Sequence, residues 1–238
     1  MSESITVERD GDLAVLRVDR PPANALDLPL LDRMLEAVAE LGAAEPGAVV
    51  LTGTGSFFSA GLDLKVVPGL DSVGKREMVG GINRMFEALY GFPRPIVCAV
   101  NGHAVAGGMI LALCGDLRVG SSDASYGLTE VKVGIPYPVC AIEIVRAELA
   151  PGAARRLTLH AGLVKPPVAL ELGAVDELRP PAEVEPRARE LAAELATLPS
   201  AAYAVTKEAL RGGALERMRR GMEGTDPVVR FWQEELAG

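Results

Sequence analysis

Apolar and polar residues follow strand and helix patterns in turn through the first half of the chain. Residues 5–9 and 13–19 read as two strands joined by a turn. From residue 31 apolar positions recur at helical spacing, with Asp27 as the predicted N-cap and Gly42 as the predicted end. The other elements predicted here are strands at 48–52, 95–101 and 117–120 and helices at 82–90 and 109–114, with no clear pattern over 63–80. Strands that alternate with helices predict an α/β fold with crossover connections.

The strand pattern fades after residue 151, and helices punctuated by Pro and Gly take its place. The predicted helices are 151–161, 167–172, 183–198, 201–211 and 215–236. The last of these helices carry Ala-rich faces, which would pack on the core or on another subunit.

Composition excludes several classes of protein. Hydrophobic residues make up 49% of the 238 residues, enough for a substantial core, and the formal charge of −8 argues against a broad nucleic-acid surface. Three cysteines without CxxC spacing and only two histidines predict neither a disulfide framework nor a metal site. No apolar run can span a bilayer and the N-terminus lacks signal-peptide features, so we expect a cytoplasmic protein with no membrane partner.

Two glycine-containing junctions between a strand and a helix are candidate anion sites. They are residues 54–64, TGSFFSAGLDL, and residues 101–109, NGHAVAGGM. Free backbone N–H groups converge at such a junction, and the helix dipole favours negative charge there. Neither junction fits GxGxxG or GxxxxGK[ST], so a phosphate loop is disfavoured. Each loop, taken alone, is equally compatible with tight packing.

A third candidate is Glu130, which lies among apolar and small residues ahead of a Gly/Pro-rich bend. Burial in such surroundings would raise the pKa of its carboxyl, which suits a base that takes and returns a proton. The alternative, and the more common situation for an isolated glutamate, is a surface residue beside Lys132.

Together, and in this order, these segments resemble the crotonase superfamily of acyl-CoA enzymes. Residues 58–64 are similar to its first oxyanion loop, and residues 94–102 with 106–108 are similar to its second. Residues 20–26, 114–119 and 126–136 continue the pattern, and the resemblance runs from about residue 7 to residue 175.

The resemblance implies a fold and an assembly. The fold would be a crotonase-like spiral of repeated ββα units with a helical C-terminal region. The spiral, with its CoA site, would occupy residues 1–180. The helical region, residues 181–238, would pack on the core, on a neighbouring subunit or on both. Such chains assemble as homotrimers or dimers of trimers, and their acyl-chain pocket would run along residues 72–90.

The resemblance also implies roles for single residues. The backbone N–H groups of Leu62 and Gly107 would hold the thioester oxygen, and they would stabilise an enolate more than a neutral carbonyl. The CoA part of the substrate would lie along Ala23, Ala25, Ala60, Asp63, Leu64, Lys65 and Gly108. Lys65 would sit near the CoA phosphates, unless it is only a solvated lysine. We expect Asp116 and Arg118 to form a structural charge pair, and His103 to serve packing.

Departures from the family pattern point to one reaction. Family hydratases carry two glutamates; Glu130 matches one, but the other position, three residues beyond Gly107, holds Ile110. Dienoyl-CoA isomerases and hydrolytic dehalogenases carry a carboxylate eight residues beyond Glu130, where this chain has Pro138. One carboxylate suffices for a 1,3-proton shift. The resemblance therefore favours a Δ3,Δ2-enoyl-CoA isomerase with Glu130 as its sole proton carrier.

Two alternatives remain open from the residues. One is an enoyl-CoA hydratase in which Tyr137 or a bound water supplies the missing acid. The other is a non-catalytic acyl-CoA binder, which the retained Glu130 argues against because a buried unpaired carboxyl is costly. In each case CoA enters as part of the acyl-CoA partner, and no separate cofactor and no metal are expected.

Overall fold

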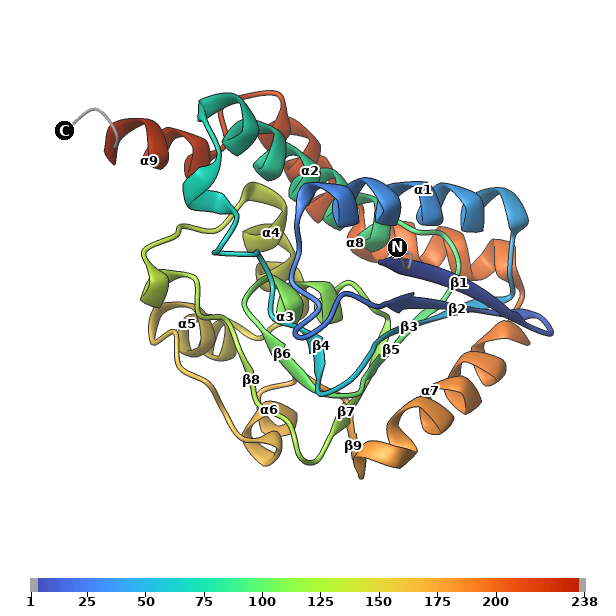
Figure 1. Ribbon diagram of the computed structural model, residues 1–238. Coiled ribbons are helices and arrows are strands. Elements are labelled where there is room, and N and C mark those ends of the chain that lie inside the picture. The colour runs from blue at the N-terminus through green and yellow to red at the C-terminus, as the bar shows by residue number, and fades with distance from the viewer. Residues whose placement is uncertain (1–3, 236–238) are drawn as a thin grey trace.

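The computed structural model describes residues 4–235, whose strands form two sheets (Figure 1). The larger, six-stranded sheet has the order β1 (Ile5–Asp10), β2 (Leu13–Val18), β3 (Ala48–Gly53), β5 (Ile96–Val100), β7 (Leu117–Ser121), β9 (Glu177–Arg179). Only β1 and β2 pair antiparallel; the other neighbours in this sheet are parallel. The smaller, three-stranded sheet is parallel and consists of β4 (Phe57–Ser59), β6 (His103–Val105) and β8 (Tyr126–Gly127).

The chain passes repeatedly from the larger sheet to the smaller one and then into a helix. The repeats are β3–β4–α2 (Ser72–Tyr90), β5–β6–α3 (Gly107–Leu113) and β7–β8–α4 (Val139–Glu148). This arrangement confirms the predicted α/β spiral of ββα units. Because equivalent strands of successive repeats are parallel neighbours, the segments that follow β4, β6 and β8 lie at the same edge of the small sheet. That edge is where the functional site forms.

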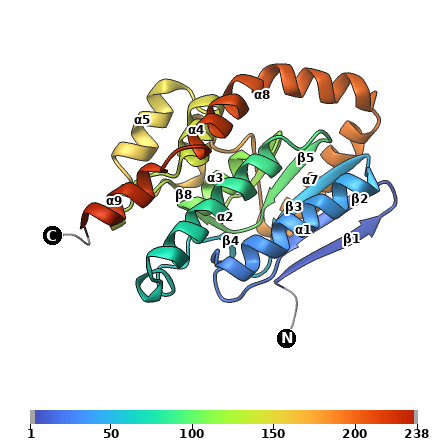
Figure 2. The same cartoon turned by 90° about the horizontal axis from the view of Figure 1, so that it is seen from above.

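Both faces of the four central strands of the larger sheet, β2, β3, β5 and β7, are buried. Along β2, Ala14 and Leu16 face the main core, while Leu13 and Val15 face a second cluster. Helix α7 (Pro181–Ala196) covers that second cluster with three residues at helical spacing, Val184, Ala188 and Ala192. Helix α1 (Leu28–Ala44) lies on the opposite face from α7 (Figure 1). Figure 2 shows α1, α2 and α8 (Ser200–Met222) side by side above the sheet. A strand buried on both faces explains why these segments read as continuous apolar runs.

Two helix boundaries differ from the predictions. Helix α1 continues through Gly42 to Ala44, and Glu45 ends it in a left-handed conformation. Helix α2 begins at Ser72, ten residues before the predicted start at Ile82, because the Asp71 carboxylate caps its first turn. Its first turns lie largely at the surface, so their polar residues gave no helical apolar pattern.

The predicted break between helices 201–211 and 215–236 is also wrong. Helix α8 runs through Gly212 and Gly213 to Met222, and a short final helix, α9, spans Pro227–Glu235. The buried positions of α8 continue at helical spacing across the glycine pair, which explains why packing overrides the low helix propensity there; they are Lys207, Arg211, Ala214, Leu215 and Met218. The predicted end at Leu236 lies outside the described residues.

Several elements had no sequence prediction. Strands β4, β6, β8 and β9 are two or three residues long, too short for an alternating pattern.

Helices α5 (Pro151–Leu159) and α6 (Pro166–Glu171) follow the predictions closely. Helices α7, α8 and α9 all contact the core of their own chain, whereas contact with a neighbouring subunit remains a prediction. Within residues 4–235, no helix combines the length and apolar character that crossing a membrane requires.

Asp116 and Arg118 are structural, but they do not pair with each other as predicted. Asp116 accepts a hydrogen bond from Lys207 at 2.7 Å, and Arg118 pairs with Asp176 at 3.0 Å. Both partners come from later in the chain, so charge alternation within one strand could not reveal them.

Candidate active site

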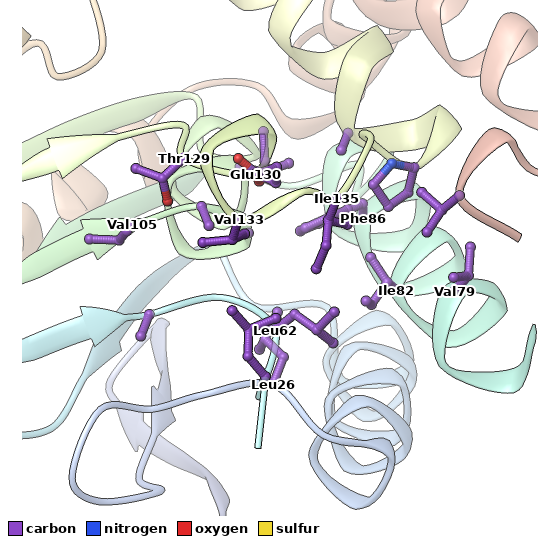
Figure 3. A pocket seen from close by; sticks show the side chains of 18 of the residues that line it. Leu26, Leu62, Val79, Ile82, Phe86, Val105, Thr129, Glu130, Val133 and Ile135 are labelled. Atoms are coloured by element: carbon purple, nitrogen blue, oxygen red, sulfur yellow. The ribbon is translucent and has the colours of Figure 1, made fainter. Parts of the chain in front are cut away.

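A mostly apolar cavity of about 210 Å³ opens beside the edge of the small sheet (Figure 3). Thr129 and Glu130 are the only residues with side-chain oxygens among the described residues that line it. In Figure 3 these two lie on one wall, Leu62 and Leu26 lie on the opposite wall, and Val79 lies toward the far end. The cavity therefore has one polar wall segment and an apolar interior, the composition typical of small-molecule sites.

The two glycine junctions meet at this cavity. Gly61 has φ +75°, and a Cβ atom there would lie 2.5 Å from the backbone nitrogen of Gly107. A Cβ atom on Gly107 would lie 3.7 Å from the backbone nitrogen of Leu62. Only glycine fits at Gly61, for both backbone conformation and space. The close approach makes the amides of Leu62 and Gly107 neighbours at the cavity wall.

Neither of these two amides has an acceptor within residues 4–235, although the surrounding backbone is well hydrogen-bonded. Gly107 is the first residue of α3, whose N-terminal N–H groups have no partner inside the helix. Ala106, just before it, has φ +51°, a strained conformation for a residue with a side chain. Two adjacent unused donors, one held by a strained residue, can stabilise negative charge on a bound oxygen.

Glu130 follows β8 and begins the turn that leads to α4. Glu130 is only 8% exposed, so the alternative prediction of a surface glutamate beside Lys132 is wrong. Burial raises the pKa of the carboxyl to about 7, although the backbone of Glu130, the Tyr137 hydroxyl and the backbone of Thr129 partly offset this. Its Oε2 atom has no hydrogen-bond partner in the described part of the chain. A carboxyl with a pKa near neutrality can both take and return a proton.

The loops predicted to bind CoA are joined to one another. The Ala60 amide donates to the Ala23 carbonyl at 2.9 Å, and Arg20 bonds both the Ala25 carbonyl, at 3.1 Å, and the Asp63 carboxylate, at 2.9 Å. Burial acts to raise the pKa of Asp63, but the hydrogen bonds from Arg20 and from the Lys65 amide outweigh it and lower that pKa. Asp63 therefore fixes the loop through its side chain, and any contact with CoA falls to its backbone.

The remaining predicted residues lie at different depths. Leu64 lines the cavity and is exposed. Lys65, the next residue, is also exposed, so both side chains are accessible to a long ligand. Gly108 does not line the cavity; a Cβ atom there would collide with the Ser59 carbonyl, so this glycine allows α3 to pack against that loop. His103 also lies outside the lining, where its Nδ1 accepts from the Ser125 amide at 3.0 Å. Its role is packing and loop support.

Two further helices contribute to the cavity lining, and the sequence had placed only the first of them there. Helix α2 contributes Val79, Ile82 and Phe86 to the cavity, along the segment where the acyl-chain pocket was expected. Helix α9 adds Val228 and Trp232, which no sequence argument had placed there. An apolar helix face predicts burial but does not say which cavity it lines. Among the described residues, no three His, Cys, Asp or Glu side chains are grouped as a metal site would require.

Similar sequences cover nearly the whole chain. The pattern of the family described as enoyl-CoA hydratase/isomerase matches residues 8–229. A putative enoyl-CoA hydratase of Thermus thermophilus is 38% identical over 221 residues, which span 89% of this chain and 86% of that relative. A crotonyl-CoA hydratase of Syntrophomonas wolfei is 30% identical over 224 residues, which span 92% of this chain and 86% of that relative.

Similar structures include two of one Mycobacterium tuberculosis protein, each 33% identical to this chain. One is described as a probable enoyl-CoA hydratase, with a TM-score of 0.89 over 93% of this chain and 94% of that one. The other is described as an enoyl-CoA isomerase, with a TM-score of 0.88 over 94% of this chain and 98% of that one. One and the same similar protein is thus described with both reactions.

Proposed function

This chain belongs to the enoyl-CoA hydratase/isomerase family, an enzyme family that acts on acyl-CoA thioesters, and we propose that it converts 3-enoyl-CoA to 2-enoyl-CoA. One observation carries the proposal: Glu130 is the only carboxylate among the described residues that line the cavity. Ile110, at the position of the second family glutamate, also lines the cavity and is fully buried. A site with a single buried carboxyl suits a reaction that moves one proton and adds none.

The proposed reaction needs one base and one oxyanion site. The Glu130 carboxylate removes a proton from C2 of the 3-enoyl thioester, and the electron pair moves onto the thioester oxygen as a dienolate. The free amides of Leu62 and Gly107 hold that oxygen, which carries full charge only after proton removal. Glu130 then returns the proton to C4, which leaves the double bond between C2 and C3.

The pKa of Glu130 supports this cycle. With a pKa of about 7 the carboxyl is about half ionised at neutral pH, so it can act as base and then as acid without a second group. The Ile110 and Phe86 side chains in the cavity lining offer water no hydrogen-bond partner near the dienolate. Protonation at C4 is thus favoured over side reactions.

The CoA part of the substrate is assigned to the open side of the cavity. Hydrogen bonds join the loops that carry Ala23, Ala25 and Ala60. The last of these loops continues into the exposed residues Leu64 and Lys65. Backbone groups of these loops would contact the pantetheine. The exposed Lys65 ammonium is available to the phosphates. CoA thus enters with the substrate, and the proposal requires no other cofactor.

The decisive experiment is Glu130→Gln assayed with 3-enoyl-CoA. Glutamine keeps the size and polarity of the side chain but cannot cycle a proton, so we expect turnover to fall by about 10²–10⁴-fold. Binding of the CoA ester should change little, because the oxyanion amides and the rim are untouched. The matched control is Glu216→Gln, at an exposed site on α8 outside the cavity lining. Wild-type turnover in Glu130→Gln would refute the mechanism.

The second candidate is an enoyl-CoA hydratase. It is favoured by the names of the two relatives, which are 38% and 30% identical and are described as hydratases. Parallel assays with 3-enoyl-CoA and 2-enoyl-CoA separate the candidates, since a hydratase consumes the second by water addition and an isomerase does not. Binding of both esters without turnover would instead indicate a non-catalytic acyl-CoA binder.

We also propose that the chain assembles as a homotrimer or a dimer of trimers. Three large apolar residues at the C-terminal helices are exposed in the single chain, namely Leu198, Val205 and Leu210. Burying such residues against a neighbour would be favourable. Light scattering should give a mass that is a multiple of three chains, and a monomer would contradict this assembly.

A further inference from the structure

In the described part of the chain, two buried oxygens without hydrogen-bond partners belong to Glu130, which lines the cavity, and to Tyr137, which does not. Among the described residues, the Tyr137 hydroxyl and Glu130 Oε2 are both shielded from solvent, and neither makes a hydrogen bond of acceptable geometry. The turn between the two residues brings Tyr137 back toward Glu130, and each group changes the pKa of the other. Buried polar atoms without partners are rare in folded proteins and call for an explanation.

The turn after Glu130 accounts for this placement. The amides of Val133 and Ile135 both donate to the Glu130 carbonyl, at 3.1 and 3.0 Å, and Gly134 takes a left-handed conformation between them. The chain therefore folds back on itself, and Tyr137 approaches the glutamate from which the turn began. Within residues 4–235, Ile135 lines the cavity but Tyr137 does not. The hydroxyl thus reaches Glu130 from behind the cavity wall.

We propose that Tyr137 is a positioning residue, whose hydroxyl donates a hydrogen bond to the ionised Glu130 carboxylate and holds it toward the cavity. The inference rests on the proposed role of Glu130 as the proton carrier. Because Tyr137 lies outside the cavity lining, it acts through Glu130 and does not transfer a proton to the substrate. This placement also argues against the hydratase variant in which Tyr137 supplies the missing acid.

The physical benefit lies in the ionisation of the base. Burial alone raises the pKa of Glu130, and a hydrogen bond to the charged form lowers it again. Tyr137 is a dependable donor because burial and the nearby Glu130 charge raise its own pKa, so it stays protonated. No other titratable side chain in the described part of the chain affects the pKa of Glu130. After the backbone of Glu130 itself, and together with the backbone of Thr129, Tyr137 thus helps to keep the base partly ionised near neutral pH.

The test is Tyr137→Phe, which retains the ring and removes only the hydroxyl. Loss of a hydrogen bond to a charged group should raise the pKa seen in the kcat/KM profile by about one pH unit. Turnover at pH 7 should then fall about fivefold and recover at high pH, with KM for the CoA ester unchanged. A merely structural role would move stability without moving this pKa.

Tyr90→Phe is the matched control. Tyr90 is another buried tyrosine whose hydroxyl bonds a glutamate, Glu148, at 2.8 Å, but it lies outside the cavity lining. Its removal should leave the kinetic pKa in place. An unchanged pKa in Tyr137→Phe would overturn the proposal. A loss of kcat that is the same at every pH would also overturn it, because the hydroxyl would then take part in proton transfer.

A titration that does not depend on turnover separates this inference from the proposed function. Carboxyl carbon NMR can follow Glu130 directly, with the signal assigned by its absence in Glu130→Gln. A higher Glu130 pKa in Tyr137→Phe supports the hydrogen bond even if the wild-type enzyme fails to isomerise 3-enoyl-CoA. If isomerisation depends on Glu130 but the titration is the same in both proteins, only the role of Tyr137 is refuted.

Discussion

Two regions of the molecule bury charge to a similar degree but surround it differently. Beneath α8, Arg211 and Lys207 are 4% and 7% exposed, and both pair with Asp116, at 3.2 and 2.7 Å. Glu130 is 8% exposed and has no ionic partner within the described residues. The first region uses buried charge to fix a helix, whereas the second leaves it free to change protonation state. The presence of an ionic partner, more than the depth of burial, distinguishes the structural carboxylate Asp116 from the proposed catalytic carboxylate Glu130.

The paired region is extensive. Arg211 donates to the carbonyls of Tyr90, Cys114 and Gly115 at 3.0 to 3.1 Å, and its guanidinium lies 4.2 Å from the centre of the Tyr90 ring. Two of these carbonyls, of Cys114 and Gly115, directly follow the last residue of α3, the helix that starts at Gly107. Helix α8 is therefore tied to the same element that presents an oxyanion amide.

The largest expected effect on stability comes from breaking the paired region. Arg211→Met keeps the length of the side chain but removes one of the two cations that pair with Asp116 and the donor that serves three carbonyls, so we expect the free energy of unfolding to fall by about 3–5 kcal/mol. Urea denaturation would measure it. Arg220→Met, which removes an exposed pair with Glu216, is the control and should cost less than about 1 kcal/mol. Equal losses in the two variants would contradict a special role for the buried cluster.

Removing the unpaired charge should have the opposite sign. The pKa of Glu130 is raised to about 7, so between its ordinary value near 4.5 and pH 7 the folded protein holds a proton that the unfolded chain has released. The free energy of unfolding therefore falls as pH rises through this window. Glu130→Gln lacks this penalty and should be more stable than wild type at pH 8, by at most about 3 kcal/mol.

Denaturation curves at several pH values would check this comparison. The stability difference between Glu130→Gln and wild type should be constant below about pH 4.5, grow toward pH 7 and then level off. A difference that does not vary with pH would mean that Glu130 titrates normally. The same variant that loses turnover would then gain nothing in stability, and the contrast with the paired region would fail.

A second unpaired carboxyl can be introduced next to the first. Ile110→Glu places a carboxyl at a fully buried position of the cavity wall, where desolvation and the nearby Glu130 would keep it protonated at neutral pH. We expect a loss of about 1–3 kcal/mol in the free energy of unfolding. Water addition to 2-enoyl-CoA should rise relative to isomerisation. Ile110→Gln is the matched control: it adds polarity without an acid, so it should destabilise but not promote hydration.

The sequence predicted the site better than it predicted the helices around it. The site was predicted from short motifs that occur in a specific order along the chain. The structure brings the loops at Gly61 and Gly107 and the carboxyl of Glu130 to one cavity. Helix α8 was predicted as two helices because local propensity argued for a break at Gly212. The tertiary anchors at Lys207 and Arg211 override it. Their partners lie about ninety residues away in the sequence, and local sequence patterns cannot reveal contacts between residues so far apart.

The contribution of α9 was unpredictable for a related reason. Val228 and Trp232 reach the cavity because Asp226 accepts hydrogen bonds from Asn83 at 2.8 Å and from the Val139 amide at 2.9 Å, which ties α9 to α2 and α4. A buried polar link among three helices has no signature in composition or periodicity. Exposed residues such as Lys65 pose the opposite problem, because almost any surface tolerates a lysine.

The smallest expected effect concerns Lys65, whose charge is exposed, in contrast to the buried charges of the two regions compared above. Lys65 is exposed and follows Leu64 of the cavity lining, and its contact with CoA phosphates would be screened by water and salt. Lys65→Ala should therefore weaken acyl-CoA binding by less than about 1 kcal/mol, and the loss should shrink as salt is added. Calorimetric titration at two salt concentrations would measure it. Binding of a thioester that lacks the CoA phosphates serves as the control and should not change. If both ligands lost affinity equally, Lys65 would act on the shape of the loop and not on the phosphates.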